Sequence, residues 1–168
     1  MIATLPILIF AGLLLFAALS DITTMTIPNW VSITLAAAFV VLAPFYGVSF
    51  ATIGVNLLLG FGALVLGFVL FQFRILGGGD AKLIAAAAIW VGLECLLPFA
   101  YMTAIAGGAT SIILLMARAR MLPHPYFPEF VNRLLKPGGG LPYGVAIAAG
   151  GFAALSALPF AANPLTLP

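Results

Sequence analysis

The sequence predicts an all-α integral membrane protein with about six membrane-spanning helices and one further helix at the membrane surface. Of its 168 residues, 64% are hydrophobic and only 6% are charged, and the mean hydropathy is +1.28. A soluble domain carries about 25% charged residues, so this chain lacks the polar side chains that a water-facing surface requires. The length suits a single domain, residues 1–168, embedded in the bilayer.

Long apolar runs separated by short polar stretches define the expected spans, since about 20 apolar residues are needed to cross the hydrocarbon. Residues 83–117 are too long a run for one span, so we expect two spans there with a turn around residues 94–98. No Lys or Arg precedes the first run, which argues against a cleavable secretory signal. The expected spans are residues 1–20, 30–45, 52–73, two within 83–117, and 141–162.

A shorter amphipathic segment follows the fifth expected span. Its apolar residues recur with helical spacing, and Glu129 and Arg133 form an i,i+4 pair on the other side. This pattern predicts a helix that lies in the membrane interface. The apolar positions are Phe127, Phe130, Val131, Leu134 and Leu135.

The basic residues indicate how the chain is oriented in the membrane. With six spans, every Lys and Arg falls on one side, whereas Glu94 falls on the other. The positive-inside rule makes the basic side cytoplasmic, so the amphipathic helix is expected there and both termini outside. The net charge of +2 gives no indication of nucleic acid binding. The bases are Arg74, Lys82, Arg118, Arg120, Arg133 and Lys136.

Asp21 and Asp80 are the only aspartates in the chain, and each is expected at the cytoplasmic end of a membrane helix. An acid close to hydrocarbon is costly, so its default interpretation is functional. Two neighbouring carboxyl groups share a proton, so one can activate a water while the other donates to a carbonyl oxygen. Aspartic proteolysis uses this arrangement and needs no metal or other cofactor. Spacing alone leaves open that the acids are polar helix ends or partners of Lys82 and Arg74.

Gly77 and Gly79 stand immediately before Asp80. Because glycine has no Cβ, it allows another backbone to come close. We expect these glycines to bring Asp80 beside an extended peptide, and a flexible glycine turn is the alternative.

Three motifs resemble those of the prepilin peptidases, the bacterial members of the GxGD membrane aspartic proteases. Gly77-x-Gly79-Asp80 followed by Ala81-Lys82-Leu83 is similar to the family's G-x-G-D-x-K-L signature. Asp21 followed by Ile27-Pro28-Asn29 resembles the first family motif, and Pro142-Tyr143-Gly144 resembles the segment that opens the last helix. The motifs come in the family's order and extend over nearly the whole chain.

This resemblance implies that Asp21 and Asp80 are the two catalytic aspartates. It also implies cleavage of the leader of type IV prepilins or pseudopilins at the cytoplasmic face of the bacterial inner membrane. The expected partners are the prepilin substrate, the lipid bilayer, and pilus or secretion assembly proteins.

Two departures from the longer family members narrow this expectation. Those members carry a cytoplasmic cysteine-rich insertion and also N-methylate the new amino terminus. Here the first polar loop is only residues 21–29, and Cys95 is the sole cysteine, which argues against methyltransferase activity. The short form resembles the peptidases of Flp, or tight-adherence, pilus systems. Thr23, Thr24 and Thr26 stand where many relatives have basic residues.

Further residues of the three motifs are expected to bind substrate or shape the site. Lys82 is expected either to orient an aspartate or hold an acidic substrate residue, or to be only a topology anchor. The other candidates are Pro28, Asn29, Pro142, Tyr143 and Gly144.

Two other classes of function remain as alternatives. The first is a proton- or ion-coupled transporter that uses the two acids as a relay, although such relays lie near the bilayer midplane. The second is a non-catalytic scaffold of a secretion complex.

Overall fold

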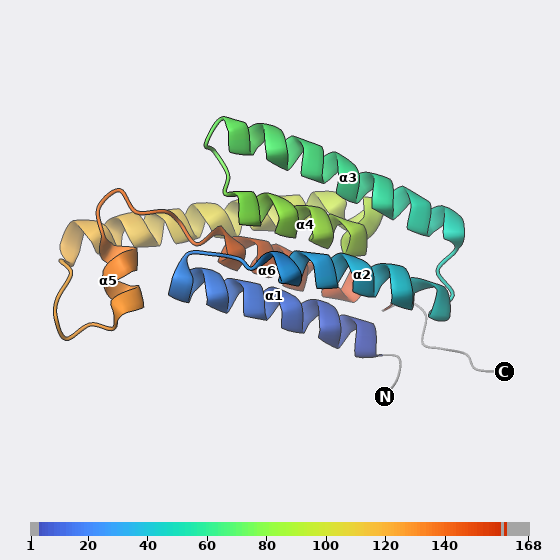
Figure 1. Cartoon of the computed structure of the whole chain (residues 1–168), viewed down its shortest axis with the longest axis horizontal. Helices are drawn as coiled ribbons and strands as arrows, with labels where there is room; N and C mark the ends of the chain where they lie inside the picture. The colour runs from blue at the N-terminus through green and yellow to red at the C-terminus, as the bar shows by residue number, and fades with distance from the viewer. Residues whose placement is uncertain (1–3, 159, 161–168) are drawn as a thin grey trace.

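The computed structural model describes residues 4–158 and 160, and within them every regular element is a helix (Figure 1). The predicted all-α class is therefore confirmed for this part of the chain. Residues 1–3 of the first expected span and 159, 161 and 162 of the last lie outside the described residues. The helices are α1 (Leu5–Thr24), α2 (Asn29–Phe45), α3 (Phe50–Gln72), α4 (Gly78–Arg120), α5 (Glu129–Leu135), α6 (Tyr143–Ala153) and a 3₁₀ helix, η2 (Leu155–Ala157).

Three of the described helices, α1, α3 and α4, are long and apolar enough to cross a bilayer. The apolar helices α2 and α6 are shorter. Together with their hydropathy, these helices indicate an integral membrane protein. The count of six spans stays a prediction, because length and composition identify only three of them.

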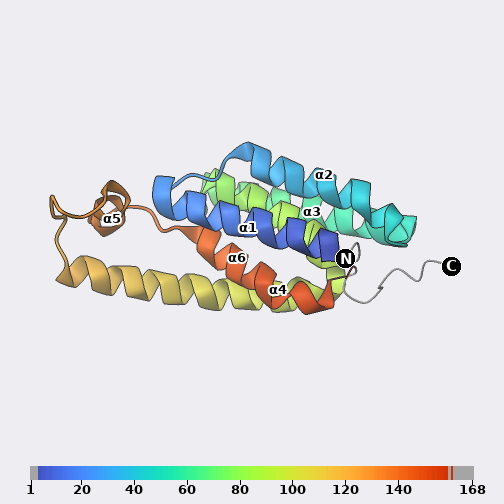
Figure 2. The same ribbon diagram turned by 90° about the horizontal axis from the view of Figure 1, so that it is seen from below.

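The helix α4 reverses its direction at Gly92, which has φ 63° and ψ −175°. The two arms, residues 78–91 and 93–120, run in opposite directions through the bundle (Figures 1 and 2). Two segments within this apolar run were predicted, but the position of the turn was wrong. The reversal occurs at Gly92, whose lack of a Cβ permits this backbone conformation. Glu94 and Pro98, around which the turn was expected, both lie in the second arm.

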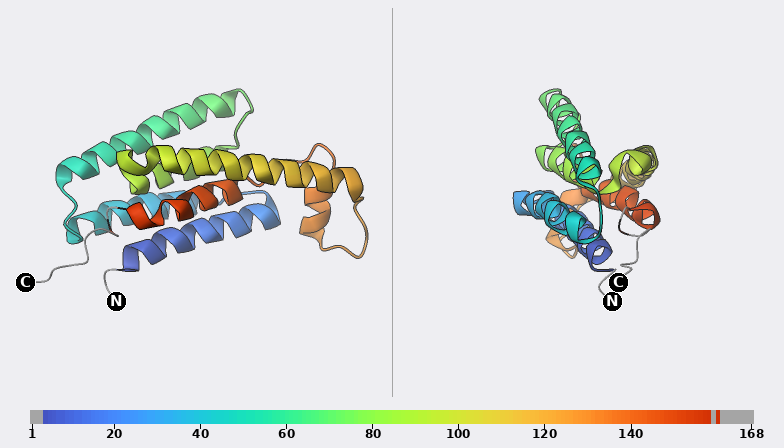
Figure 3. Two further views of the ribbon diagram at one scale, coloured as in Figure 1. Left: turned by 180° about the vertical axis from the view of Figure 1, so that it is seen from behind. Right: turned by 90° about the vertical axis from the view of Figure 1, so that its right-hand side faces the viewer.

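Small residues allow the helices to approach one another closely. In α3, a Cβ added at Gly60 would overlap the side chain of Ile89, and one at Gly67 would lie 2.8 Å from the Cβ of Ala81. These contacts hold α3 against the first arm of α4, at the edge of the bundle (Figure 3). The helix α6 packs between α1 and the second arm of α4 through its own glycines.

An aromatic cluster forms the centre of the core. Trp90, in the first arm of α4, packs against Phe10 of α1 and Phe39 of α2. Its indole Nε1–H donates a buried 2.8 Å hydrogen bond to the carbonyl oxygen of Leu35. The cluster therefore fixes the first arm of α4 against both α1 and α2.

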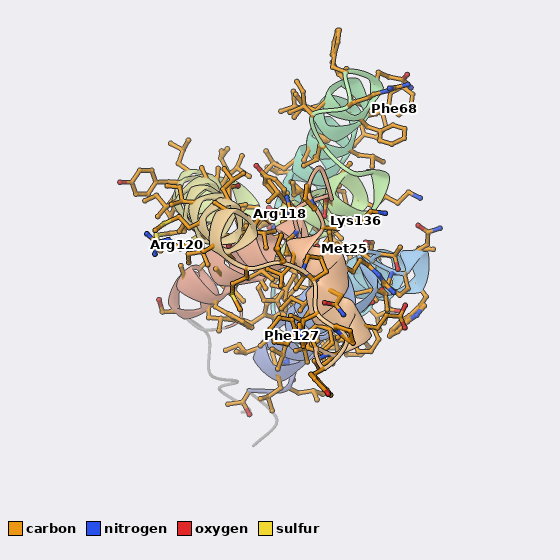
Figure 4. The ribbon with its side chains drawn as sticks, turned by 90° about the vertical axis from the view of Figure 1, so that its left-hand side faces the viewer. Met25, Phe68, Arg118, Arg120, Phe127 and Lys136 are labelled. Carbon is orange, nitrogen blue, oxygen red and sulfur yellow. The ribbon has the colours of Figure 1, made fainter. Side chains whose placement is uncertain are left out.

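One end of the bundle collects the end of α1, the beginnings of α2, α4 and α6, and α5 (Figure 1). Figure 4 looks onto this end, where Met25, Arg118, Arg120 and Lys136 are labelled. The predicted amphipathic helix is α5, which begins at Glu129 and not at Phe127. Its Glu129–Arg133 pair is an ion pair of 3.0 Å.

Candidate active site

Asp21 lies in the last turn of α1 and is only 5% exposed. Asp21 was expected at the end of a membrane helix, but the span was expected to end at residue 20, whereas α1 continues to Thr24. Met25 then ends the helix in a left-handed conformation and donates its N–H to the carbonyl oxygen of Asp21. The carboxyl Oδ2 of Asp21 accepts a 2.7 Å hydrogen bond from the backbone N–H of Gly144.

Asp80 is the third residue of α4, whose N-cap is Gly77. The Asp80 Oδ2 accepts the backbone N–H of Gly77 at 3.2 Å. A carboxylate in the first turn of a helix satisfies a free N–H and interacts favourably with the helix dipole. The local sequence therefore fixes this acid at the beginning of the first arm.

The two acids, which come from different helices, line the same two cavities. The larger cavity, of about 1020 Å³, and the smaller, of about 240 Å³, both include Asp21 and Asp80 in their walls. The carboxyl groups are near enough to interact electrostatically. Among the described residues, no N–H or O–H donates to the Oδ1 of either acid. These oxygens are therefore available to a water or a substrate.

Gly79 explains how the two motif segments meet. A Cβ at this position would lie 3.2 Å from the Cβ and 3.4 Å from the carbonyl oxygen of Ile27. The beginning of α4 therefore packs directly against the loop between α1 and α2. Gly77 is also crowded, since a Cβ there would lie 2.6 Å from the Oδ2 of Asp80.

Pro28, Asn29 and Lys82 lie beside this junction. Pro28 is the N-cap of α2, and Asn29 lines the smaller cavity. The Lys82 ammonium donates a 2.8 Å hydrogen bond to the Asn29 side-chain oxygen. Lys82 is not in the wall of either aspartate cavity, and within residues 4–158 and 160 it forms no ion pair with Asp21 or Asp80.

The start of α6 completes the wall around Asp21. Pro142 is the N-cap of this helix, and Tyr143 lines the larger cavity. A Cβ at Gly144 would lie 3.0 Å from the Cβ and 3.1 Å from the Oδ2 of Asp21. The motif residues from the two ends of the chain are thus brought together.

Three basic residues that the sequence analysis did not assign to the site line the larger cavity. Arg133 lies in α5, Lys136 is its C-cap, and Arg74 lies in the loop between α3 and α4. The Arg118 guanidinium donates to the carbonyl oxygens of Leu134 at 2.8 Å and Gly140 at 2.7 Å. The sequence signal for Arg133 and Lys136 is the concentration of bases around an amphipathic helix, which by itself indicates only the orientation of the chain in the membrane.

The comparisons agree with the motifs. The family model described as the type IV leader peptidase family matches residues 8–112, a region that includes both Asp21 and Asp80. The matched region ends before α5 and α6. Searches of the curated proteins and of the solved structures found no match. Since the family model covers more than half of the chain, the chain belongs to the type IV leader peptidase family.

Proposed function

We propose that this chain is an aspartic endopeptidase that removes the leader peptide of type IV or Flp-type prepilins or pseudopilins, with Asp21 and Asp80 as its catalytic pair. Membership of the leader peptidase family supports a protease that acts on pilin-type substrates. The observation that carries the catalytic assignment is that two acids 59 positions apart line the same pair of cavities.

Cleavage begins with a water held between the two carboxyl groups, one ionised and one protonated. The ionised aspartate removes a proton from the water as its oxygen attacks the scissile carbonyl carbon. The protonated aspartate donates its proton to the carbonyl oxygen, which gives a neutral tetrahedral diol. The two carboxyl groups have then exchanged protonation states.

Collapse of the diol uses the same two groups in reverse. The newly protonated aspartate donates its proton to the amide nitrogen, and the other aspartate removes a proton from one diol hydroxyl. The C–N bond then breaks, which releases a carboxylic acid and an amine and restores the starting protonation states. The backbone N–H groups of Gly144 and Gly77 hold the two carboxyl groups in place throughout.

The surroundings of the acids favour reaction at a membrane surface. The larger cavity lies at the end of the bundle that carries α5 and the bases Arg133 and Lys136. By the positive-inside rule, we propose that this end faces the cytoplasm at the bacterial inner membrane, with both termini outside. We also propose that the whole chain forms one membrane-embedded peptidase domain.

The loop between α1 and α2 supports the short form of the enzyme. It covers only residues 25–28, and the single cysteine, Cys95, is buried. This loop therefore contains no cysteine-rich insertion, and we propose peptidase activity without N-methylation.

The experiment is to replace Asp21 and Asp80 individually with Asn and to follow processing of a co-expressed prepilin. Asn keeps the shape of the side chain but cannot cycle a proton, so each variant is expected to lose about 10²- to 10⁴-fold or more in rate. Glu94→Gln is the matched control, since Glu94 follows the reversal of α4 and lines neither aspartate cavity. If either Asp variant inserts into the membrane and processes prepilin at the normal rate, the assignment is wrong.

A further inference from the structure

A third cavity lies beside the two aspartate cavities, between α2, α3 and the first arm of α4. Its volume is about 440 Å³. Most of its lining is apolar, including Ala36 of α2, Phe61 of α3 and Ile89 of α4. The glycine at position 60 brings α3 down onto Ile89, which forms the floor. Because α3 packs mainly on α4 and touches α2 little, an apolar groove remains between α2 and α3.

One polar group in this groove lacks a partner. Ser32 lines the groove, is 7% exposed, and its hydroxyl has no hydrogen-bond partner. A helical serine commonly satisfies itself on a carbonyl of the preceding turn, but Ser32 does not. A buried hydroxyl without a hydrogen bond costs free energy. This hydroxyl is therefore free to bond a polar backbone or side-chain group of an occupant of the groove.

The groove adjoins the aspartate site at Asn29. This residue lines both the groove and the smaller aspartate cavity. Lys82, whose ammonium is bonded to the Asn29 side chain, lines the same end of the groove. An occupant that enters the groove from the acids would pass a positive charge first and apolar side chains afterwards.

We infer that this groove binds the apolar segment of the substrate that adjoins the scissile bond, with Lys82 facing a carboxylate of that segment; the inference rests on the proposed peptidase function. The groups from the aspartate cavity into the groove come in the order that such a substrate segment requires. The acids lie at the scissile bond, Asn29 and Lys82 come next, and the apolar walls around Ser32 follow. A lipid acyl chain would also suit the walls, but it would have no need of a groove that adjoins the acids.

The first test fills the groove. Ala36→Trp places a large side chain in it, whereas the control Ala37→Trp adds the same ring at an exposed position of α2 that lines a different cavity. Each variant is assayed on a full-length membrane-inserted prepilin and on a short peptide that spans the cleavage site without the apolar segment. We expect Ala36→Trp to lower kcat/KM for the prepilin by about tenfold or more, and to leave cleavage of the peptide unchanged.

The outcomes separate the groove from the catalytic assignment. Normal prepilin cleavage by Ala36→Trp would overturn the groove assignment, and so would an equal loss on both substrates, which would indicate a damaged fold. A wild-type protein that cleaves neither substrate would instead overturn the proposed function. Loss on the prepilin alone, with Ala37→Trp normal on both, supports the inference.

The second test detects the occupant directly. A photoreactive benzoylphenylalanine replaces Phe61 in the groove, or Leu66 at an exposed position of the same helix as control. We expect prepilin to crosslink at position 61 and not at position 66. Crosslinking of position 61 to lipid alone, or equal prepilin crosslinking at both positions, would overturn the inference.

Discussion

The backbone N–H of Gly144 donates a 2.7 Å hydrogen bond to the Oδ2 of Asp21, which joins α6 to α1 across 123 positions of the chain. No side chain is involved on the Gly144 side, so the interaction depends on how closely the two helices approach. The contact is close, because a Cβ at Gly144 would also lie 3.3 Å from the carbonyl oxygen of Ala17. The helix α6 therefore positions an acid that belongs to α1.

We predict that Gly144→Ala impairs cleavage. The added methyl group would lie 3.0 Å from the Cβ of Asp21, so the carboxyl group or α6 must shift. A displacement of about 1 Å at a reacting group costs about 10²-fold in rate, so we expect a fall of about ten- to a hundredfold in kcat.

Gly108→Ala is the matched control for this change. Gly108 is in the second arm of α4, and a Cβ there meets nothing within 4 Å. It is expected to retain full activity and to gain up to about 1 kcal/mol in stability. Normal cleavage by Gly144→Ala would show that the hydrogen bond to Asp21 does not set the geometry of the site.

The glycines before Asp80 provide a second prediction, which separates Gly79 from its neighbour. A Cβ at Gly79 would press on Ile27, whereas one at Gly78 would make ordinary contact with the Phe71 ring at 3.5 Å. We expect Gly79→Ala to lower prepilin cleavage by about tenfold or more, because the acids move apart. Gly78→Ala should be nearly normal in the same assay. Equal effects of the two changes would refute the proposed contact with the α1–α2 loop.

Much of the site could be predicted from the sequence because its parts are short motifs. The motif residues Asp21, Asp80, Tyr143 and Gly144 do meet, although they come from three different helices. The roles of the individual residues stay predictions. The motifs do not specify tertiary contacts, such as the hydrogen bond from Lys82 to Asn29.

The reversal of α4 illustrates a limit of sequence interpretation. Pro98 and Glu94 are the conspicuous interruptions of the apolar run, but both are part of a helix in the structure. Pro98 lies near the beginning of the second arm, where only a few helical hydrogen bonds precede it. Gly92 carries the reversal, and one glycine among many has no distinguishing pattern around it. Its role follows from packing against α3, which the sequence does not specify.

We predict that Gly92→Ala destabilises the protein. Its backbone conformation, φ 63° with ψ −175°, belongs to a region that is essentially restricted to glycine. A Cβ would also lie 3.1 Å from the side-chain oxygen of the buried Asn56 in α3. We expect a loss of about 1–3 kcal/mol, measured by thermal unfolding in detergent. Gly62→Ala, at an open helical position in α3, is expected to lose no stability, and equal unfolding temperatures for the two variants would contradict the prediction.

The last prediction concerns Arg118, which connects α4 to the segment that follows it. Its guanidinium donates to the carbonyl oxygens of Leu134, in the last turn of α5, and of Gly140, in the segment between α5 and α6. Gly140 lines the larger cavity and stands four positions before Gly144. Arg118 should therefore hold in place the backbone that leads to the hydrogen bond on Asp21.

Arg118→Gln is expected to lower kcat by about tenfold and to speed limited proteolysis between residues 121 and 142, because neither carbonyl retains its charged donor. Arg120→Gln is the control, since it removes an equal charge from a side chain that has no hydrogen bond or ion pair among the described residues. If the two variants lose activity equally, net positive charge near the site, and not the position of the Gly140 backbone, is what cleavage requires. Faster proteolysis with normal kcat would show that this segment can loosen without disturbing Asp21.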